Sequence, residues 1–72
     1  MEHEITISLA AARVNAGMTQ AQVATALHVG KQTIGNWETG KVIPNYPALK
    51  ALSDLYRVPM DSIRLPSKST ES

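Results

Sequence analysis

The sequence predicts an all-α fold, a compact bundle of five short helices around one core. Apolar residues recur at helical spacing in successive segments, whereas no segment sustains the alternation typical of a β-strand. Glycines and prolines separate these segments where helices are expected to begin or end. With 72 residues the chain suffices for one domain, which we place at residues 1–65, followed by a disordered polar tail at residues 66–72, PSKSTES.

The first expected helix ends at Gly17, a residue suited to the left-handed conformation that closes helices, and Thr6 or Ser8 can cap its start. The inward-facing series of this helix is expected to be Ile5, Leu9, Ala12, Val14 and Ala16.

The second expected helix begins after Thr19, a good N-cap, and Gln22 three residues later completes a capping-box pattern. This helix is expected to bury Val23, Ala24 and Leu27 and to end near His28.

A connection of about three residues leads to the third expected helix, at about residues 31–39. Its apolar residues are Ile34 and Trp37, both expected to point inward, and Gly40 is expected to end it. Trp37 is expected in the core rather than as a stacking platform.

Pro47 suits the first turn of the fourth expected helix. The buried stripe of this helix is expected to comprise Ala48, Leu49, Ala51, Leu52, Leu55 and Tyr56. After Val58, a core residue, residues 59–63 are expected to form the fifth and last helix.

Several protein classes are excluded by composition. The chain has no cysteine, so it has neither disulfides nor a thiolate metal site. No apolar run approaches the roughly 18 residues of a membrane span, and the start, MEHEITIS, carries acids where a secretory signal needs bases. No nucleophile, acid–base dyad, metal cluster or phosphate-binding loop is apparent. We expect a cytoplasmic protein that is not an enzyme and that binds no metal or cofactor.

The net charge is only +1, but its distribution is uneven. The stretch from residue 13 to residue 50 carries a single acid, Glu38, against four bases: Arg13, Lys31, Lys41 and Lys50. The middle of the chain is therefore locally basic, which favours a polyanionic partner weakly.

Two short helices joined by a three-residue turn, with the small Ala24 where they cross, indicate a helix-turn-helix motif. Once Ile34 and Trp37 point inward, the polar side of the third helix must face outward. Amide, hydroxyl and ammonium groups there match the donors and acceptors of base edges in the DNA major groove. The predicted base-contacting residues are Lys31, Gln32, Thr33, Gly35 and Asn36, with Gly35 permitting close approach.

The segment MTQAQVATALHVGKQTIGNWETGKVIP resembles the lambda-repressor-like family of DNA-binding domains, which includes Cro/C1-type (XRE) regulators. The resemblance extends over about residues 5–65. It implies that Gln20 holds a phosphate and braces a base-reading residue. It also implies that the loop at residues 40–45, including Lys41 and Asn45, contacts phosphates, although Lys41 and Lys50 could equally be idle surface lysines.

The same resemblance implies an internal ion pair between Arg13 and Glu38. Two positions depart from the family pattern. His28 stands where a left-handed glycine is usual, at a cost on the order of 1 kcal/mol. Gly30 replaces the usual capping serine.

We therefore expect a sequence-specific regulator of transcription that binds double-stranded DNA, specifically a repressor of phage or mobile-element type. It would bind a near-palindromic operator as a homodimer, with half-sites roughly 34 Å apart. The dimer contact is expected from Met60, Ile63 and Leu65, with contributions from Tyr46 and Tyr56, unless a longer native chain supplies it. The alternative is a protein-interaction module with the same fold, such as an antitoxin or a coactivator-like protein.

Overall fold

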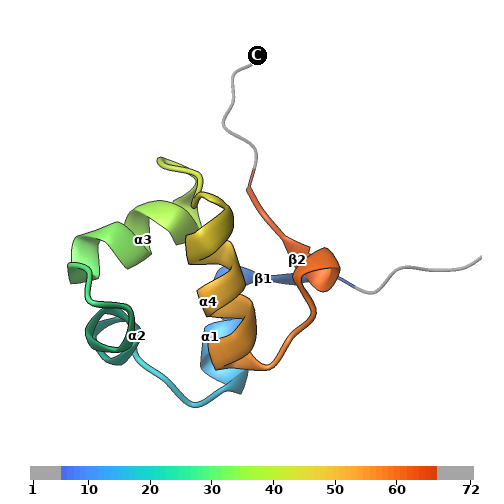
Figure 1. Ribbon diagram of the computed structural model, residues 1–72, viewed down its shortest axis with the longest axis horizontal. Coiled ribbons are helices and arrows are strands. Elements are labelled where there is room, and N and C mark those ends of the chain that lie inside the picture. Colours follow the sequence, from blue (N-terminus) through green and yellow to red (C-terminus); the bar gives the residue numbers. More distant parts are fainter. Residues whose placement is uncertain (1–5, 67–72) are drawn as a thin grey trace, which may run out of the picture.

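The computed structural model describes residues 6–66, and within them the chain forms four α-helices (Figure 1). Their bounds are α1 Leu9–Asn15, α2 Gln20–Leu27, α3 Lys31–Thr39 and α4 Tyr46–Tyr56. Ile5 and nearly all of the predicted tail, residues 67–72, lie outside the described residues. The all-α class is confirmed, and α3 has the predicted bounds.

The fifth helix, expected as one short turn at residues 59–63, is not an α-helix, so the described residues form four α-helices rather than five helices. Only Met60–Ser62 are helical, as a single 3-10 turn, η1, that follows Pro59. Ile63 is already extended, with φ −87° and ψ 125°. The turn ends early because its backbone continues into a strand, where Ile63 finds hydrogen-bond partners outside the helix.

That strand, β2 (Ile63–Arg64), pairs in parallel with β1 (Ile7–Ser8), so that Ile7 lies opposite Ile63. Neither two-residue strand has a sequence signal, because alternation needs at least four residues to be visible. Arg64 Nη1 also donates to Thr6 Oγ1 at 3.0 Å. The two ends of the described chain are therefore held side by side (Figure 1).

The pairing displaces the start of α1. Since Ile7 and Ser8 are in the strand, α1 begins at Leu9, with the Ser8 side chain accepting from Ala11 N–H at 3.1 Å. Leu9 and Ala12 are buried as predicted. Val14 is 62% exposed and Ala16, the C-cap of α1, is exposed too, so the assignment of these two residues to the inward series is wrong.

The predicted cap of α2 is present, and α4 has a side-chain cap that the sequence analysis did not predict. Thr19 and Gln22 form the reciprocal capping box of α2. At α4, the Asn45 side chain accepts from Ala48 N–H at 3.0 Å and Pro47 lies in the first turn. His28 has φ 61°, the predicted left-handed conformation.

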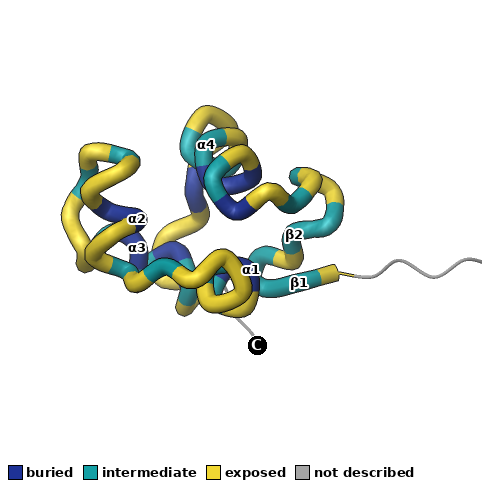
Figure 2. The backbone as a smooth tube through the Cα atoms, turned by 90° about the horizontal axis from the view of Figure 1, so that it is seen from below, coloured by how far each residue is buried: buried dark blue, intermediate teal, exposed yellow. Residues whose placement is uncertain are grey.

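One core joins all four α-helices, and Figure 2 shows the buried stretches on the sides of the helices that face one another. Its buried members are Leu9, Ala12, Val23, Ala24, Ile34, Trp37, Leu52 and Tyr56. Tyr56 is thus unavailable for the predicted dimer contact, and Ile63 and Leu65 also pack against this core. No helix among the described residues has the length and apolarity needed to cross a membrane.

Candidate nucleic-acid interface

The turn between α2 and α3 is held by backbone hydrogen bonds. His28, in its left-handed conformation, ends α2 with its N–H directed at Ala24 O and Thr25 O, and Val29 N–H donates to Ala24 O at 3.0 Å. Gly30 then begins α3 without a side-chain cap. Because these bonds fix the turn, the angle between α2 and α3 is set by the backbone itself.

The inner side of the helix pair is apolar and closely packed. Ile34 is 1% exposed and Trp37 is 8% exposed, so both point inward as predicted. Val23 and Ala24 lie opposite them on α2, with Val23 entirely buried. The small side chain of Ala24 permits the close approach of α2 and α3 that this burial requires.

The outer side of α3 carries the polar residues that the sequence analysis assigned to base contacts. Lys31 and Gln32 are exposed, and Thr33, Gly35 and Asn36 are half-buried. Among the described residues, no hydrogen bond or ion pair engages the side chains of Lys31, Gln32, Thr33 or Asn36. Their donors and acceptors are therefore open to an external partner.

Arg13 and Glu38 form an ion pair beneath this surface. Arg13 Nε lies 2.7 Å from Glu38 Oε2, and the two side chains are only 16% and 7% exposed. The hydrogen bond from Arg13 to Glu38 raises the pKa of the guanidinium above its ordinary value. A second bond, from Arg13 Nη1 to Met18 O at 2.9 Å, attaches the pair to the segment between α1 and α2.

Gln20 joins the same network through its amide. Gln20 Nε2 donates to Glu38 Oε1 at 2.9 Å, so within the described residues this side chain braces the ion pair rather than a base-reading residue. A Cβ on Gly35 would lie 3.8 Å from Gln20 Nε2, an ordinary contact. The lack of a side chain at Gly35 is therefore not required by packing against α2.

The loop after α3 holds the remaining two predicted phosphate contacts. Lys41 is exposed and, among the described residues, makes no ion pair. Asn45 is exposed too, but its side-chain oxygen is engaged in capping α4. The backbone N–H of Val42, in the same loop, already donates to Asn36 O at 3.2 Å.

Comparison with known proteins agrees with this geometry. A family model described as helix-turn-helix matches residues 9–63. The chain belongs to the helix-turn-helix family. The matching model is of the Cro/C1 type, so the resemblance found in the sequence is confirmed.

This helix-turn-helix chain is also similar to the HTH-type transcriptional activator BcrR of Enterococcus faecalis, with 37% identity over 51 residues. The matched part is 71% of this chain and 25% of BcrR, so the chain spans about a quarter of that relative's length. No solved structure matches the chain significantly. Together the family and the relative support DNA-binding transcription regulation as the class of function.

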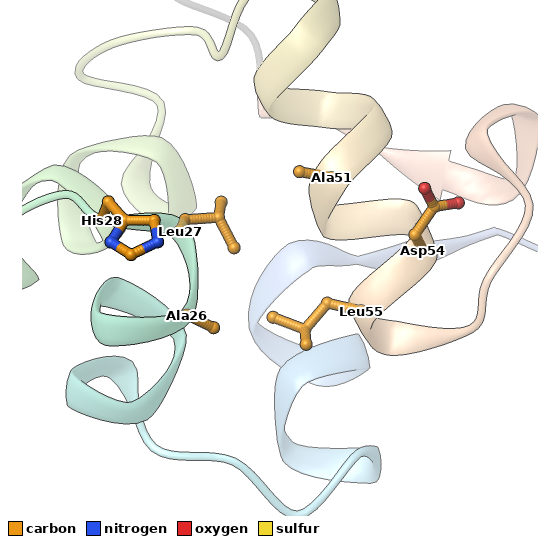
Figure 3. Close-up of a pocket in the computed structure, with 6 residues that line it drawn as sticks. All are labelled: Ala26, Leu27, His28, Ala51, Asp54 and Leu55. Atoms are coloured by element: carbon orange, nitrogen blue, oxygen red, sulfur yellow. The ribbon is translucent and has the colours of Figure 1, made fainter.

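An open depression of about 520 Å³ lies between the end of α2 and α4 of this helix-turn-helix protein (Figure 3). Leu27 and Leu55 point toward each other across it, whereas the Asp54 carboxylate is directed away from α2 and binds Lys50 Nζ at 3.2 Å. The depression includes none of the residues predicted to contact DNA, and its lining carries no cluster of polar groups that would select a ligand.

The hydrogen bond between Gln20 and Glu38 was not anticipated from the sequence. Its two residues are 18 positions apart, and capping and periodicity describe only neighbours within a few residues. Met18, whose carbonyl accepts from Arg13, was missed for the same reason, because a backbone acceptor has no residue-type signal.

Tyr56 of the helix-turn-helix core provides a test at alkaline pH. Burial, with the nearby charge of Glu38, raises the pKa of Tyr56 to about 12 from about 10 in an unfolded chain. Since the folded pKa is the higher one, this contribution to stability is complete below pH 10 and is lost as the pH rises through about 12.

Replacing Tyr56 with phenylalanine should remove this loss. We expect the wild-type chain to lose on the order of 1 kcal/mol more unfolding free energy than Tyr56→Phe between about pH 10 and pH 12. The hydroxyl makes no hydrogen bond to other described residues, so the two proteins should be similarly stable at pH 7. Urea unfolding at several pH values measures the difference; parallel pH profiles would show that the phenol is not desolvated.

Proposed function

We propose that the chain is a sequence-specific DNA-binding domain that inserts α3 into the major groove. The observation that carries the proposal is the division of α3 into two sides. Ile34 and Trp37 anchor one side in the core, while the side chains of Lys31, Gln32, Thr33 and Asn36 face outward without partners among the described residues. An α-helix fits the major groove, where such groups form hydrogen bonds with base edges.

Phosphate contacts would position the domain and supply its salt-dependent affinity. Lys41 is an exposed cation in the loop directly after α3, and its ammonium group is free within the described part of the chain. Gln20 retains a second amide hydrogen that can be donated to a phosphate while its first hydrogen is donated to Glu38. Asn45 retains its amide NH2 group.

One domain of this size covers half of an operator, so we propose a homodimer on a near-palindrome with half-sites roughly 34 Å apart. Occupying an operator that overlaps a promoter is enough to repress transcription, whereas activation requires a further contact. We therefore propose repression for this chain, whereas the relative BcrR is named an activator.

Replacing Gln32 with alanine should relax base preference at one operator position, by about 1 to 3 kcal/mol of discrimination. Thermal stability should hardly change because Gln32 is exposed. Selection of bound duplexes from a random pool, for the wild type and the variant, measures the preference. Identical selected sequences would remove Gln32 from the proposed base contacts.

The matched control is Lys41→Ala, because the proposed contact of Lys41 is with a phosphate and does not depend on the base sequence. It should weaken binding to all duplexes alike and lower the slope of log affinity against log salt by about one.

If the wild-type chain enriched no duplex and was not retained on nonspecific DNA at low salt, the DNA-binding proposal would fail. That result would favour the protein-interaction alternative.

A further inference from the structure

The side-chain amide of Gln20 lies beside the polar side of α3, although Gln20 is the first residue of α2. A Cβ placed on Gly35, a residue of that polar side, would lie 3.8 Å from Gln20 Nε2, whereas Gln20 Oε1 lies beyond 4 Å. The nitrogen of the amide, rather than its oxygen, is therefore the atom next to the surface that is proposed to face DNA.

Glu38 determines which end of this amide occupies that place. Gln20 Nε2 donates to Glu38 Oε1 at 2.9 Å. An ionised carboxylate only accepts hydrogen bonds, so it binds the nitrogen of an amide and not the oxygen. Turning the Gln20 amide over would set two acceptors against each other. The NH2 group therefore stays beside Glu38 and Gly35.

The Glu38 carboxylate is itself held firmly by Arg13. Arg13 Nε donates to Glu38 Oε2 at 2.7 Å, and Arg13 Nη2 donates to Glu38 Oε1 at 3.4 Å. The Glu38 side chain is only 7% exposed, so water competes little for its oxygens. Glu38 consequently offers Gln20 an acceptor in one fixed position.

We infer that Glu38 is a positioning residue for DNA binding, which holds the Gln20 amide so that its second hydrogen is donated to a phosphate. This inference rests on the proposed function and deepens it, because it gives the buried acid a role in affinity as well as in stability. A freely turning amide would present its oxygen to the phosphate part of the time, and the two oxygens repel. Fixing the donor orientation in advance removes that cost from binding.

The inference predicts an effect opposite in sign to that of the charge of Glu38. An acid near the interface repels DNA, so its removal should by itself strengthen binding. Glu38→Gln keeps the size of the side chain and one oxygen that can accept from Arg13. Its new NH2 group cannot accept from Gln20 and favours the turned-over amide, so the inference predicts weaker binding.

The test measures affinity for one duplex, selected by the wild-type chain from a random pool, with Glu38→Gln, Gln20→Ala and the double variant. Each single variant should bind about three- to tenfold more weakly, the usual effect of one hydrogen bond. The double variant should bind no more weakly than Gln20→Ala, because Glu38 then has no amide to position. Asp54→Asn, which removes an acid 66% exposed on α4, is the matched control and should bind at least as tightly as the wild type.

Two further readouts identify the phosphate as the acceptor. The base preference selected from the random pool should be the same for the wild type, Glu38→Gln and Gln20→Ala. The slope of log affinity against log salt should not change in Gln20→Ala, since an amide carries no charge, whereas Lys41→Ala should lower it. A changed base preference would contradict the inference, because the amide would then contact a base edge.

Thermal unfolding followed by circular dichroism should show that every variant is folded at the temperature of the binding assay. If Glu38→Gln does not fold, nuclear magnetic resonance of the wild-type chain provides the test. One NH2 proton of Gln20 should exchange with water more slowly than those of the exposed Gln32, and adding the duplex should shift the NH2 signals of Gln20. Equal exchange, or signals that the duplex leaves unmoved, would refute the positioning role.

Unchanged or tighter binding by Glu38→Gln would show that Glu38 serves stability alone, and so would losses that add up in the double variant. Either result would overturn the inference while leaving the proposed function intact. If the wild-type chain bound no duplex, the proposed function would fail and the inference would fall with it.

Discussion

Replacing Ile34 with alanine should lower the free energy of unfolding by about 3 kcal/mol, within the range for truncating a buried isoleucine. Ile34 is 1% exposed and lies where α3 meets the core, so the truncation leaves a cavity that the neighbouring helices cannot close fully. For a domain of this size the loss would lower the melting temperature by roughly 15 °C. Denaturant unfolding followed by the fluorescence of Trp37, the chain's single tryptophan, measures the change.

Gln32→Ala is the matched control on the opposite side of the same helix. Its side chain is exposed, so the unfolding free energy should change by less than about 0.5 kcal/mol. The contrast between the two variants tests the orientation of α3, on which the proposed interface depends. Equal effects on stability would mean that α3 does not divide into a buried and an open side.

Replacing Glu38 with alanine should cost about 3 kcal/mol, the lower end of the range for removing one partner of a buried ion pair. The variant leaves Arg13, only 16% exposed, without its carboxylate, and Gln20 loses an acceptor at the same time. We place the effect at the lower end because water reaches part of the guanidinium. Equilibrium unfolding at neutral pH measures it.

The surface pair of Lys50 and Asp54 is the matched control for Glu38→Ala. Its side chains are 54% and 66% exposed, so Asp54→Ala should cost less than about 0.5 kcal/mol. The double variant Arg13→Ala/Glu38→Ala should recover part of the loss, because no unpaired charge remains buried. Similar costs for Glu38→Ala and Asp54→Ala would contradict the buried character of the pair.

The features predicted correctly are those that depend on neighbours within one or two helical turns. Thr19 and Gln22 are three residues apart and form the capping box of α2. Ile34 and Trp37, also three apart, occupy the same side of α3. Such spacings follow from the geometry of the helix itself, so they can be predicted from the sequence alone.

The predictions that failed concern contacts between distant parts of the chain. The fifth helix is replaced by a 3-10 turn because Ile63 pairs with Ile7, 56 positions away. Val14 follows the helical spacing of α1 but has no element packed over it. Tyr56 was assigned both to the buried stripe of α4 and to a possible dimer contact, and burial excludes the second role.

For the candidate site, the identity of the outward-facing residues of α3 followed from the spacing of Ile34 and Trp37 alone. That their side chains are free of internal partners could be learned only from the folded chain. The same is true of Gln20, whose amide is directed to Glu38 by the crossing of α2 and α3.

The spacing of neighbouring residues thus predicted the helices, the capping box of α2 and the polar side of α3. This works because a helix repeats every 3.6 residues, so the residues of its buried side recur at that period in the sequence. Tertiary packing decided the pairing of the described chain ends, the Arg13–Glu38–Gln20 network and the exposure of Val42, Ile43 and Tyr46. Each depends on where separate elements come to lie relative to one another, a property that no short stretch of sequence contains.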